Sequence, residues 1–516
     1  MIGQIARRLG FQTAVPVAAV DDWLLPADGS ATPLAPRGGA ASCLVDRLGR
    51  LQPAHRQWTL DWSLAAGVRW VAGLESERVH QQLIAPATLE TTIETPSGTV
   101  VQRIAAAVVD GEPVAIVEFE NRGGVAIAVG LVARPLVHGG RGYLGEAAAS
   151  ATELDLGEAG AVRYEHAAST AVGDGIDLLS SLPAADAGIS TEQCRSRSGA
   201  AQAAAVFPLP HTAMLRVVVE LADAVRNEAA VPSIDDVQRG WARHLEAGVR
   251  YAVGETEVAD RSMTAVRGLL TDWPDRQHVP AVIRALSESG FTADATRVFA
   301  DADDVHDEPA LLAAVARWSM LGQATQQLDD LDRIIGAIGR AAHVAGSGAG
   351  VAGPGWLPIA FDALAHRLDL IDQPDVAARV RSLVTRPTEP AVADVLLDAS
   401  APLDRFADPI SAARALVGLR SMLVEESPGV IDLLAGLPSS WRGRTIDVLG
   451  APVSGGTLSF GVRWHGPRPA LLWEFAPADA DPVGHLPTLT AASIDPDFSS
   501  GETQGETLLA DPGWPR

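Results

Sequence analysis

The chain has 516 residues, 47% of them apolar, and is longer than one hydrophobic core usually organises. Its net charge of −24 opposes binding to nucleic acid and to an anionic membrane, because both repel an acidic surface. It contains no run of about 18 apolar residues and no apolar leader after Met1. We therefore expect a cytoplasmic, multidomain protein that spans no membrane.

Lysine is absent from the sequence, and all 40 cationic residues are arginine. This absence excludes Schiff-base chemistry, pyridoxal-phosphate attachment and a phosphate-loop lysine. Cys43 and Cys194 are the only cysteines and lack a metal-binding spacing, and the histidines form no HExxH motif. We expect two reduced, buried thiols, no metal site and no cofactor.

Residues 1–205 are predicted to form an antiparallel β-sandwich domain. Apolar residues alternate along one strand, at Val125, Ile127, Val129, Leu131 and Ala133. The turn residues 120–124 before this strand predict a hairpin with residues 117–119, and Pro96-Ser97-Gly98 predicts a second hairpin over residues 89–109. Even spacing within a strand-like stretch places Trp58, Trp62 and Trp70 in the sandwich core.

Residues 206–427 are predicted to form antiparallel helix pairs, because apolar residues recur there every three or four positions. The pairs are expected over residues 286–300, 320–344 and 371–383, with Gly290 as a left-handed cap and Pro374 in a first helical turn. Such pairs stack either as an open solenoid or as a closed toroid. About ten helices fit the available length, so we expect a shortened or incomplete toroid.

Residues 428–476 are predicted to form a small C-terminal β unit, with a hairpin over residues 458–475 around Trp464-His465-Gly466. Residues 477–516 are acidic and rich in Pro, Gly and Thr, and we expect a loosely ordered tail there.

This order of zones resembles the six-hairpin glycosidase superfamily, which includes glucoamylase-like proteins. The resemblance is carried by "EFENRGGVAIAVGLVARP" in the sandwich, "VPAVIRALSESGFTADATRVF" and "PALLAAVARWSMLGQATQQLDDLDRIIGAIGRAAHVA" in the helix pairs, and "GLPSSWRGRTIDVLGAPVSGGTLSFGVRWHGPRPALLWEF" in the C-terminal unit. It implies an (α/α)6 toroid between an N-terminal β-sandwich and a small C-terminal β-sheet cap. It also implies a carbohydrate partner, an α-linked glucan or a related glycoside, held in a rim pocket of the toroid.

Glycoside hydrolysis requires two carboxyl groups, one to protonate the leaving oxygen and one to activate water or attack. We assign Asp304 in the acidic stretch 301–308 as the acid, and Asp404 in "DASAPLDRFADP" as the base. Two other interpretations stay open for these acidic stretches. Their carboxylates are typical of helix N-terminal caps, and residues 301–308 also offer oxygen ligands for calcium.

Trp273 in "TDWPDRQHVP" and Trp356 are predicted to bind substrate, because indole rings stack on the CH faces of sugars; the alternative is that they cover the core at helix ends. The resemblance implies an Arg-Asp pair that binds the sugar in the same loop, and there the sequence offers Asp275 and Arg276. The resemblance places a general acid in residues 346–356, but "GSGAGVAGPGW" contains no carboxylate. The alternative hypothesis is therefore a catalytically degenerate relative, a pseudoenzyme that serves as a saccharide-binding or protein-interaction scaffold. An open solenoid between two unrelated β modules is a third hypothesis.

Overall fold

The computed structural model describes most of the chain. The described residues are 31–38, 43–66, 69–72, 79–95, 98–165, 169–174, 178, 193–221, 231–253, 256–271, 278–300, 308–321, 351–370, 372–383, 385–387, 409–478 and 486–513. The chain divides into two compact units, Met1–Ala242 and Arg243–Arg516.

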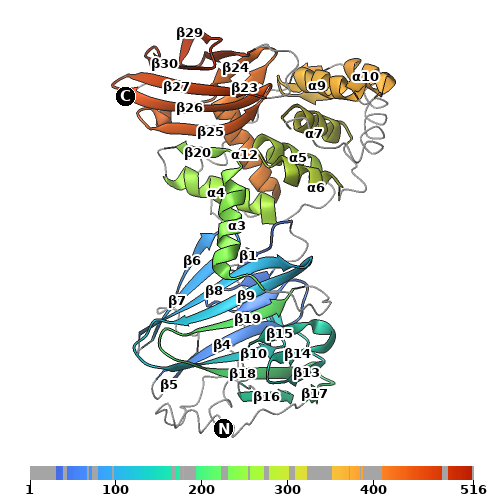
Figure 1. The fold of residues 1–516 in the computed structure, drawn as a ribbon, viewed down its shortest axis with the longest axis vertical. Helices are drawn as coiled ribbons and strands as arrows, with labels where there is room; N and C mark the ends of the chain where they lie inside the picture. The colour runs from blue at the N-terminus through green and yellow to red at the C-terminus, as the bar shows by residue number, and fades with distance from the viewer. Residues whose placement is uncertain are drawn as a thin grey trace. The chain divides into compact units, whose positions relative to one another are not determined.

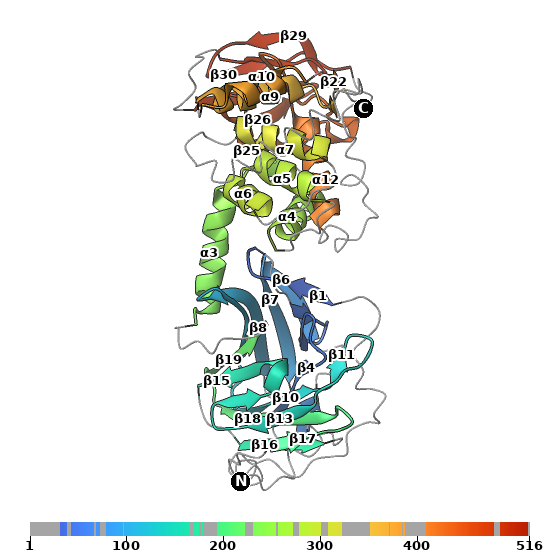
Figure 2. The same cartoon turned by 90° about the vertical axis from the view of Figure 1, so that its right-hand side faces the viewer.

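The first unit contains two large antiparallel sheets that form two layers (Figures 1 and 2). One sheet has the strand order β1-β2-β3-β4-β10-β18-β16, with β5 also paired to β4. Its strands are β1 (Thr32–Leu34), β2 (Cys43–Val45), β3 (Leu51–Pro53), β4 (Thr59–Ala66), β5 (Arg69–Ala72), β10 (Ile127–Arg134), β16 (Ser169–Asp174) and β18 (Ala201–Leu209).

The other sheet has the order β17-β13-β14-β15-β19-β9-β8-β7-β6. Its strands are β6 (Val79–Ala85), β7 (Thr88–Thr95), β8 (Gly98–Val109), β9 (Glu112–Asn121), β13 (Glu146–Ala149), β14 (Glu153–Asp155), β15 (Ala161–Tyr164), β17 (Gln193–Arg195) and β19 (Met214–Glu220). Two short strands, β11 (Leu136–Val137) and β12 (Gly140–Arg141), pair with each other and lie between β10 and β13 in sequence.

One hydrophobic core joins the facing sides of the two sheets, so the described part of this unit is a β-sandwich. Trp62 of β4 packs edge-on against Phe119 of β9, with ring centroids 6.0 Å apart. Trp58 and Trp62 are almost fully buried, which confirms their predicted place in the core. The side chain of Trp70 lies outside the described residues.

The predicted hairpin over residues 89–109 is confirmed, because β7 pairs with β8 in antiparallel register. The predicted hairpin between residues 117–119 and the strand that follows is wrong. Strand β9 pairs with β8 and β19 in one sheet, whereas β10 pairs with β4 and β18 in the other. The intervening turn therefore carries the chain from one layer to the other. The Asn121 side chain fixes this crossover by donating to the carbonyls of Val125 and Leu209 at 2.9 and 3.0 Å.

The sandwich extends beyond the boundary predicted at residue 205. That boundary falls inside β18, and β19 completes the second sheet as far as Glu220. Helix α3 (Ile234–Glu246) then begins at a capping box, in which the Ser233 and Asp236 side chains each accept the backbone N–H of the other residue. Its first residue, Ile234, packs on apolar side chains of β8 and β9.

The second unit begins with strand β20 and a series of helices. These elements are β20 (Arg250–Val253), α4 (Thr256–Thr271), α5 (Val279–Glu288), α6 (Thr292–Ala300), α7 (Glu308–Leu321), β21 (Val351–Gly353), α9 (Leu357–Leu370), α10 (Pro374–Arg381), β22 (Thr385–Pro387) and α12 (Pro409–Leu423). Helices α4, α12, α5, α7 and α9 pack successively against one another, while α6 packs on α5 and α10 on α9.

Two of the predicted helix pairs are present. Gly290 joins α5 to α6 with φ of +86°, a conformation that a glycine adopts without steric cost. Pro374 opens α10 directly after α9 and fits the first turn, where no N–H is required. Most of the predicted pair over residues 320–344 lies outside the described residues, and closure of the helices into a ring stays a prediction.

The C-terminal strands form two further sheets in the same unit. These strands are β23 (Val424–Ser427), β24 (Val430–Leu433), β25 (Ile446–Val453), β26 (Gly456–His465), β27 (Arg468–Pro477), β28 (Thr488–Ala491), β29 (Asp495–Ser500) and β30 (Gln504–Leu508). Their orders are β20-β25-β26-β27-β30 and β23-β24-β28-β29. The hairpin predicted over residues 458–475 is confirmed by β26 and β27.

Two further expectations about this region require correction. Residues 488–508 do not form a loosely ordered tail, because β28 pairs with β24 and β30 pairs with β27. Helices and C-terminal strands also belong to one compact unit rather than to separate domains. Strand β20 precedes the helices in sequence but pairs with β25 of the C-terminal sheet, which ties the two regions together.

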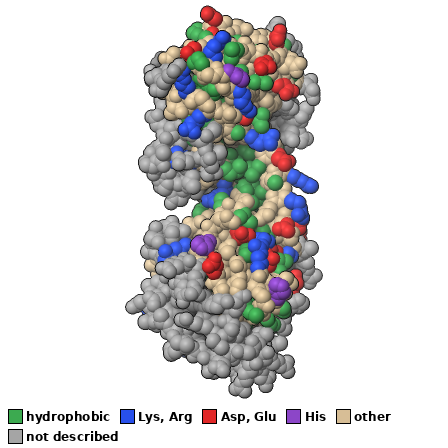
Figure 3. Space-filling model, turned by 90° about the vertical axis from the view of Figure 1, so that its left-hand side faces the viewer, with side chains coloured by type: hydrophobic (Ala, Val, Ile, Leu, Met, Phe, Trp, Pro, Cys, Tyr) green, Lys and Arg blue, Asp and Glu red, His purple; other side chains and the backbone are tan. Residues whose placement is uncertain are grey.

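Charged side chains of both signs are interspersed on the described surface drawn in Figure 3. Among the helices that the structure describes, none is long and apolar enough to cross a membrane.

Candidate functional site

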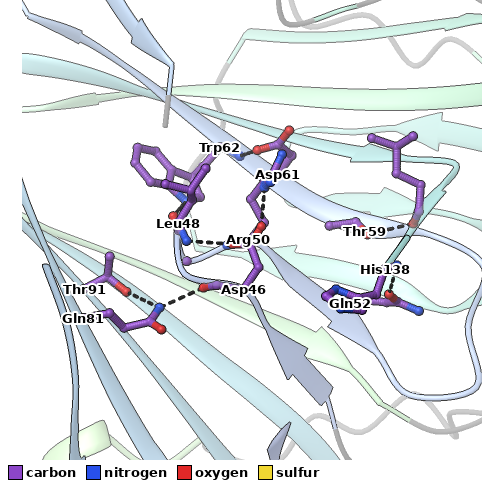
Figure 4. A network of polar contacts seen from close by, with 12 residues as sticks. Asp46, Leu48, Arg50, Gln52, Thr59, Asp61, Trp62, Gln81, Thr91 and His138 are labelled. Carbon is purple, nitrogen blue, oxygen red and sulfur yellow. Dashed lines mark hydrogen bonds and ion pairs between the residues drawn. The ribbon is translucent and has the colours of Figure 1, made fainter. Parts of the chain in front are cut away.

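A buried polar network in the β-sandwich surrounds the turn between β2 and β3 (Figure 4). Asp46 accepts the backbone N–H groups of Leu48 and Arg50 at 2.9 Å through Oδ1, and the Arg50 Nε–H at 2.6 Å through Oδ2. Gln81 donates to the Asp46 carbonyl at 2.9 Å, and Trp62 donates to the Leu48 carbonyl at 3.0 Å. The Asp46 carboxylate is directed into its own turn, so this network has a structural role.

A second buried network lies in the other unit, where helix ends meet the first C-terminal strand. Glu288 is the last residue of α5, Arg317 lies in α7, Arg420 lies in α12 and Glu426 lies in β23. Arg317 donates from Nε to Glu288 Oε1 at 3.0 Å and from Nη2 to Glu426 Oε1 at 2.7 Å. Arg420 donates to the same Glu426 oxygen at 2.8 Å, and Arg284 donates to Glu288 Oε1 at 3.1 Å. We call these five residues the Arg–Glu network.

The Arg–Glu network also holds the β25–β26 turn. Ser454 donates its backbone N–H to Glu426 Oε2 at 2.8 Å, and Arg420 donates to the Pro452 carbonyl at 2.6 Å. The network therefore connects three helices with two C-terminal sheets. Four of its members, all except Arg284, have side chains no more than 3% exposed.

Trp356, which directly precedes α9, lies against the Arg–Glu network. The guanidinium carbon of Arg317 is 4.6 Å from its ring centroid, and that of Arg284 is 5.1 Å away. Both distances lie within the range of cation–π attraction. Trp356 is 5% exposed, so its indole ring forms part of the interior of this unit.

Both carboxyl groups of the network are held in the ionised form. Burial alone raises the pKa of Glu288, but the charges of Arg284, Arg317 and Arg420 outweigh it and lower the pKa below its usual value. The same balance, with Arg317 and Arg420 as the opposing charges, lowers the pKa of Glu426. An ionised carboxylate accepts hydrogen bonds but donates no proton, so neither residue has the state required of a general acid.

Two atoms of the network have no hydrogen-bond partner among the described residues, although both are buried. They are Oε2 of Glu288, an acceptor, and Nη1 of Arg317, a donor. Buried polar atoms in proteins are normally paired, because an unpaired one loses its hydration without compensation. The spare atoms here belong to two oppositely charged side chains from different helices, and for this reason we take the Arg–Glu network as the candidate site.

Of the predicted site residues, only Trp356 lies in the described part of the chain. The predicted catalytic pair, Asp304 and Asp404, and the predicted substrate-binding residues Trp273, Asp275 and Arg276 lie outside it. Their roles stay predictions. Among the residues described, no group of three or more His, Cys, Asp or Glu side chains is placed to hold a metal ion.

The residues of the Arg–Glu network were not among the predicted site residues. The sequence does carry a signal for one of them. Arg317 is the only charged residue between Pro309 and Leu321, a stretch that forms an otherwise apolar helix. A charge in such a helix requires a buried partner. That partner, Glu426, lies 109 residues away in sequence, so no local pattern identifies it.

No protein-family model and no curated protein matches this sequence. Among solved structures, the chain is similar to a bacterial glucoamylase complexed with acarbose, with 8% identity, a TM-score of 0.40, and coverage of 72% of this chain and 68% of that one. It is also similar to a family GH92 α-mannosidase from Bacteroides thetaiotaomicron, with 7% identity, a TM-score of 0.37, and coverage of 70% and 64%. Both similarities are too remote to assign an activity.

Proposed function

We propose that this chain is a glycoside hydrolase-like protein of carbohydrate metabolism, which acts on or binds an α-linked glucan or a related glycoside through a rim pocket of its helix pairs. One observation carries the proposal. A β-sandwich is followed by helix pairs and then by β-sheets that share a compact unit with the helices. This is the order of parts that the sequence resemblance to six-hairpin glycosidases implies.

In the catalytic form of the proposal, Asp304 protonates the leaving oxygen and Asp404 activates water or attacks the sugar. Trp273, Asp275 and Arg276 bind the substrate. Trp356 contributes to the same site from beside the Arg–Glu network, where its contact with Arg317 fixes the ring. Glu288 and Glu426 are both ionised, so the general acid must be another residue.

A second candidate is a non-catalytic relative that binds a saccharide or a protein partner. The observation in its favour is the segment where the resemblance places the general acid. Its described part, residues 351–356, reads VAGPGW and contains no carboxyl group. Removal of the proton donor abolishes acid catalysis but leaves hydrogen-bonding and stacking groups able to bind.

The test is release of reducing sugar from a panel of α-linked oligosaccharides, with calorimetric binding measured for the same panel. The variants are Asp304→Asn and Asp404→Asn, and the control is Asp497→Asn on exposed strand β29. Release by the wild type and the control that is lost in both variants supports hydrolysis. Binding without release supports the non-catalytic form. Neither release nor binding would reject both candidates.

A further inference from the structure

The Arg–Glu network and Trp356 together supply three buried chemical groups. Glu288 supplies a carboxylate oxygen, Arg317 supplies a guanidinium N–H, and Trp356 supplies an aromatic ring that contacts Arg317 at 4.6 Å. The exposed fractions of these residues are 2%, 1% and 5%, so their positions are set by packing. The spare acceptor and the spare donor belong to side chains that pair directly, with Arg317 Nε 3.0 Å from Glu288 Oε1.

The other carboxylate oxygens of the network are already used. Glu288 Oε1 accepts from two arginines, and Glu426 Oε1 also accepts from two. Glu426 Oε2 accepts the Ser454 N–H. The buried hydroxyl of Tyr251 hydrogen-bonds Arg420 at the edge of the network. Among the fully buried atoms of the network, one acceptor and one donor are left without a partner, Glu288 Oε2 and Arg317 Nη1. A group that both donates and accepts a hydrogen bond suits these two atoms.

Charge selects among the groups that are able to bind there. A carboxylate or phosphate would approach the ionised Glu288, and an ammonium group would approach Arg284 and Arg317. Neither ion serves both spare atoms: an ionised carboxylate has no proton to donate to Glu288 Oε2, and an ammonium group has no acceptor for Arg317 Nη1. A hydroxyl group donates one hydrogen bond and accepts another, so it serves both.

We infer that Glu288, Arg317 and Trp356 form a buried site for hydroxyl groups, in which a hydroxyl donates to Glu288 Oε2 and a hydroxyl oxygen accepts from Arg317 Nη1. Water and the vicinal hydroxyl groups of a saccharide share this chemistry. Trp356 positions Arg317 in this site, because its ring centroid lies 4.6 Å from the guanidinium carbon. The saccharide form rests on the proposed function, whereas the water form is independent of it.

The first experiment is a pair of high-resolution crystal structures of the unmodified protein. One is determined without added saccharide, and the other from crystals soaked in an oligosaccharide that the protein binds in solution. The inference predicts ordered oxygen atoms within hydrogen-bonding distance of Glu288 Oε2 and of Arg317 Nη1. Oxygens that a saccharide replaces identify a saccharide site, and oxygens that persist unchanged identify structural water. Either atom without any oxygen neighbour would overturn the inference. This experiment requires no variant to fold.

The second experiment measures calorimetric affinity for the saccharides that the wild type binds, using Glu288→Gln and the control Glu474→Gln. Gln is similar in size to Glu but replaces one carboxylate oxygen with an NH₂ donor, so binding through that oxygen should weaken about tenfold or more. Glu474 is exposed on β27, and its variant should bind as the wild type does. Circular dichroism establishes that the variants are folded.

The outcomes separate the two proposals. Equal saccharide affinity in the wild type and a folded Glu288→Gln variant overturns the saccharide form of the inference and leaves the proposed function standing. Wild-type protein that binds no saccharide contradicts the proposed function, while the saccharide-free crystal structure still decides whether oxygens occupy the site.

Discussion

Replacement of Glu426 by alanine provides the sharpest test of the Arg–Glu network. The carboxylate accepts from Arg317, Arg420 and the Ser454 N–H, and its side chain is 1% exposed. Its removal leaves two buried guanidinium groups without that partner. Breaking a buried ion pair in this way costs about 3–5 kcal/mol, because the remaining charge keeps its desolvation penalty. For the unit Arg243–Arg516, the midpoint temperature of unfolding should fall by about 5–9 °C.

The assay is differential scanning calorimetry at neutral pH, repeated at high salt. Because the network is buried, the loss from Glu426→Ala should persist at an ionic strength that screens surface pairs. Glu474→Ala on exposed β27 is the control and should change stability by less than about 0.5 kcal/mol. The loss of stability in Glu426→Gln should lie between those of Glu426→Ala and Glu474→Ala, since the amide retains one acceptor. A Glu426→Ala loss no larger than that of the control would refute the assigned role.

Three further outcomes follow from local geometry. Burial and the facing Asp432 raise the pKa of Glu425 in the folded protein, so the contribution of Glu425 to stability is lost as pH rises through that pKa. Glu425→Gln should remove this pH-dependent loss, measured by urea denaturation at a series of pH values. Gly290→Ala should cost about 1 kcal/mol or more in the same assay, because φ is +86°. Burial raises the pKa of Cys43 to about 12, so in the native protein a thiol reagent should label Cys194 alone, and both cysteines after unfolding.

Each of these outcomes has a matched comparison. Gly240→Ala lies within α3, where an added Cβ meets no atom within 4 Å, so it should stabilise the protein by about 0.5–1 kcal/mol. Equal effects at Gly240 and Gly290 would contradict the conformational argument. A stability profile of Glu425→Gln parallel to that of the wild type would contradict the titration argument. Labelling of two cysteines in the native state would contradict the burial of Cys43.

Local patterns in the sequence predicted local structure well. Gly290 and Pro374 marked two helix pairs because each residue restricts or permits particular backbone angles. Alternation also predicted the strand now called β10. Alternation does not say which sheet a strand joins, however, so it predicts a hairpin turn where the chain crosses between the sheets at Asn121. The pairing of β9 and β10 depends on strands far away in sequence.

The candidate site was harder to predict for a related reason. Trp356 was recognised from its type and its place at a helix end, but its neighbours Arg284 and Arg317 come from other helices. Arg317 and Glu426 lie 109 residues apart in sequence and meet only in the folded unit. Strands β28–β30 were missed because their short, polar sequences resemble a flexible segment, and only pairing with earlier strands orders them.

The late strands have a consequence for the order of events during protein synthesis. Strand β28 inserts beside β24, and β30 forms an edge beside β27, so both C-terminal sheets use segments made long after their first strands. The β-sandwich has all its described strands by residue 220. We expect the β-sandwich to fold on the ribosome while the second unit still exposes unpaired strand edges. A chaperone would protect the second unit most during this period.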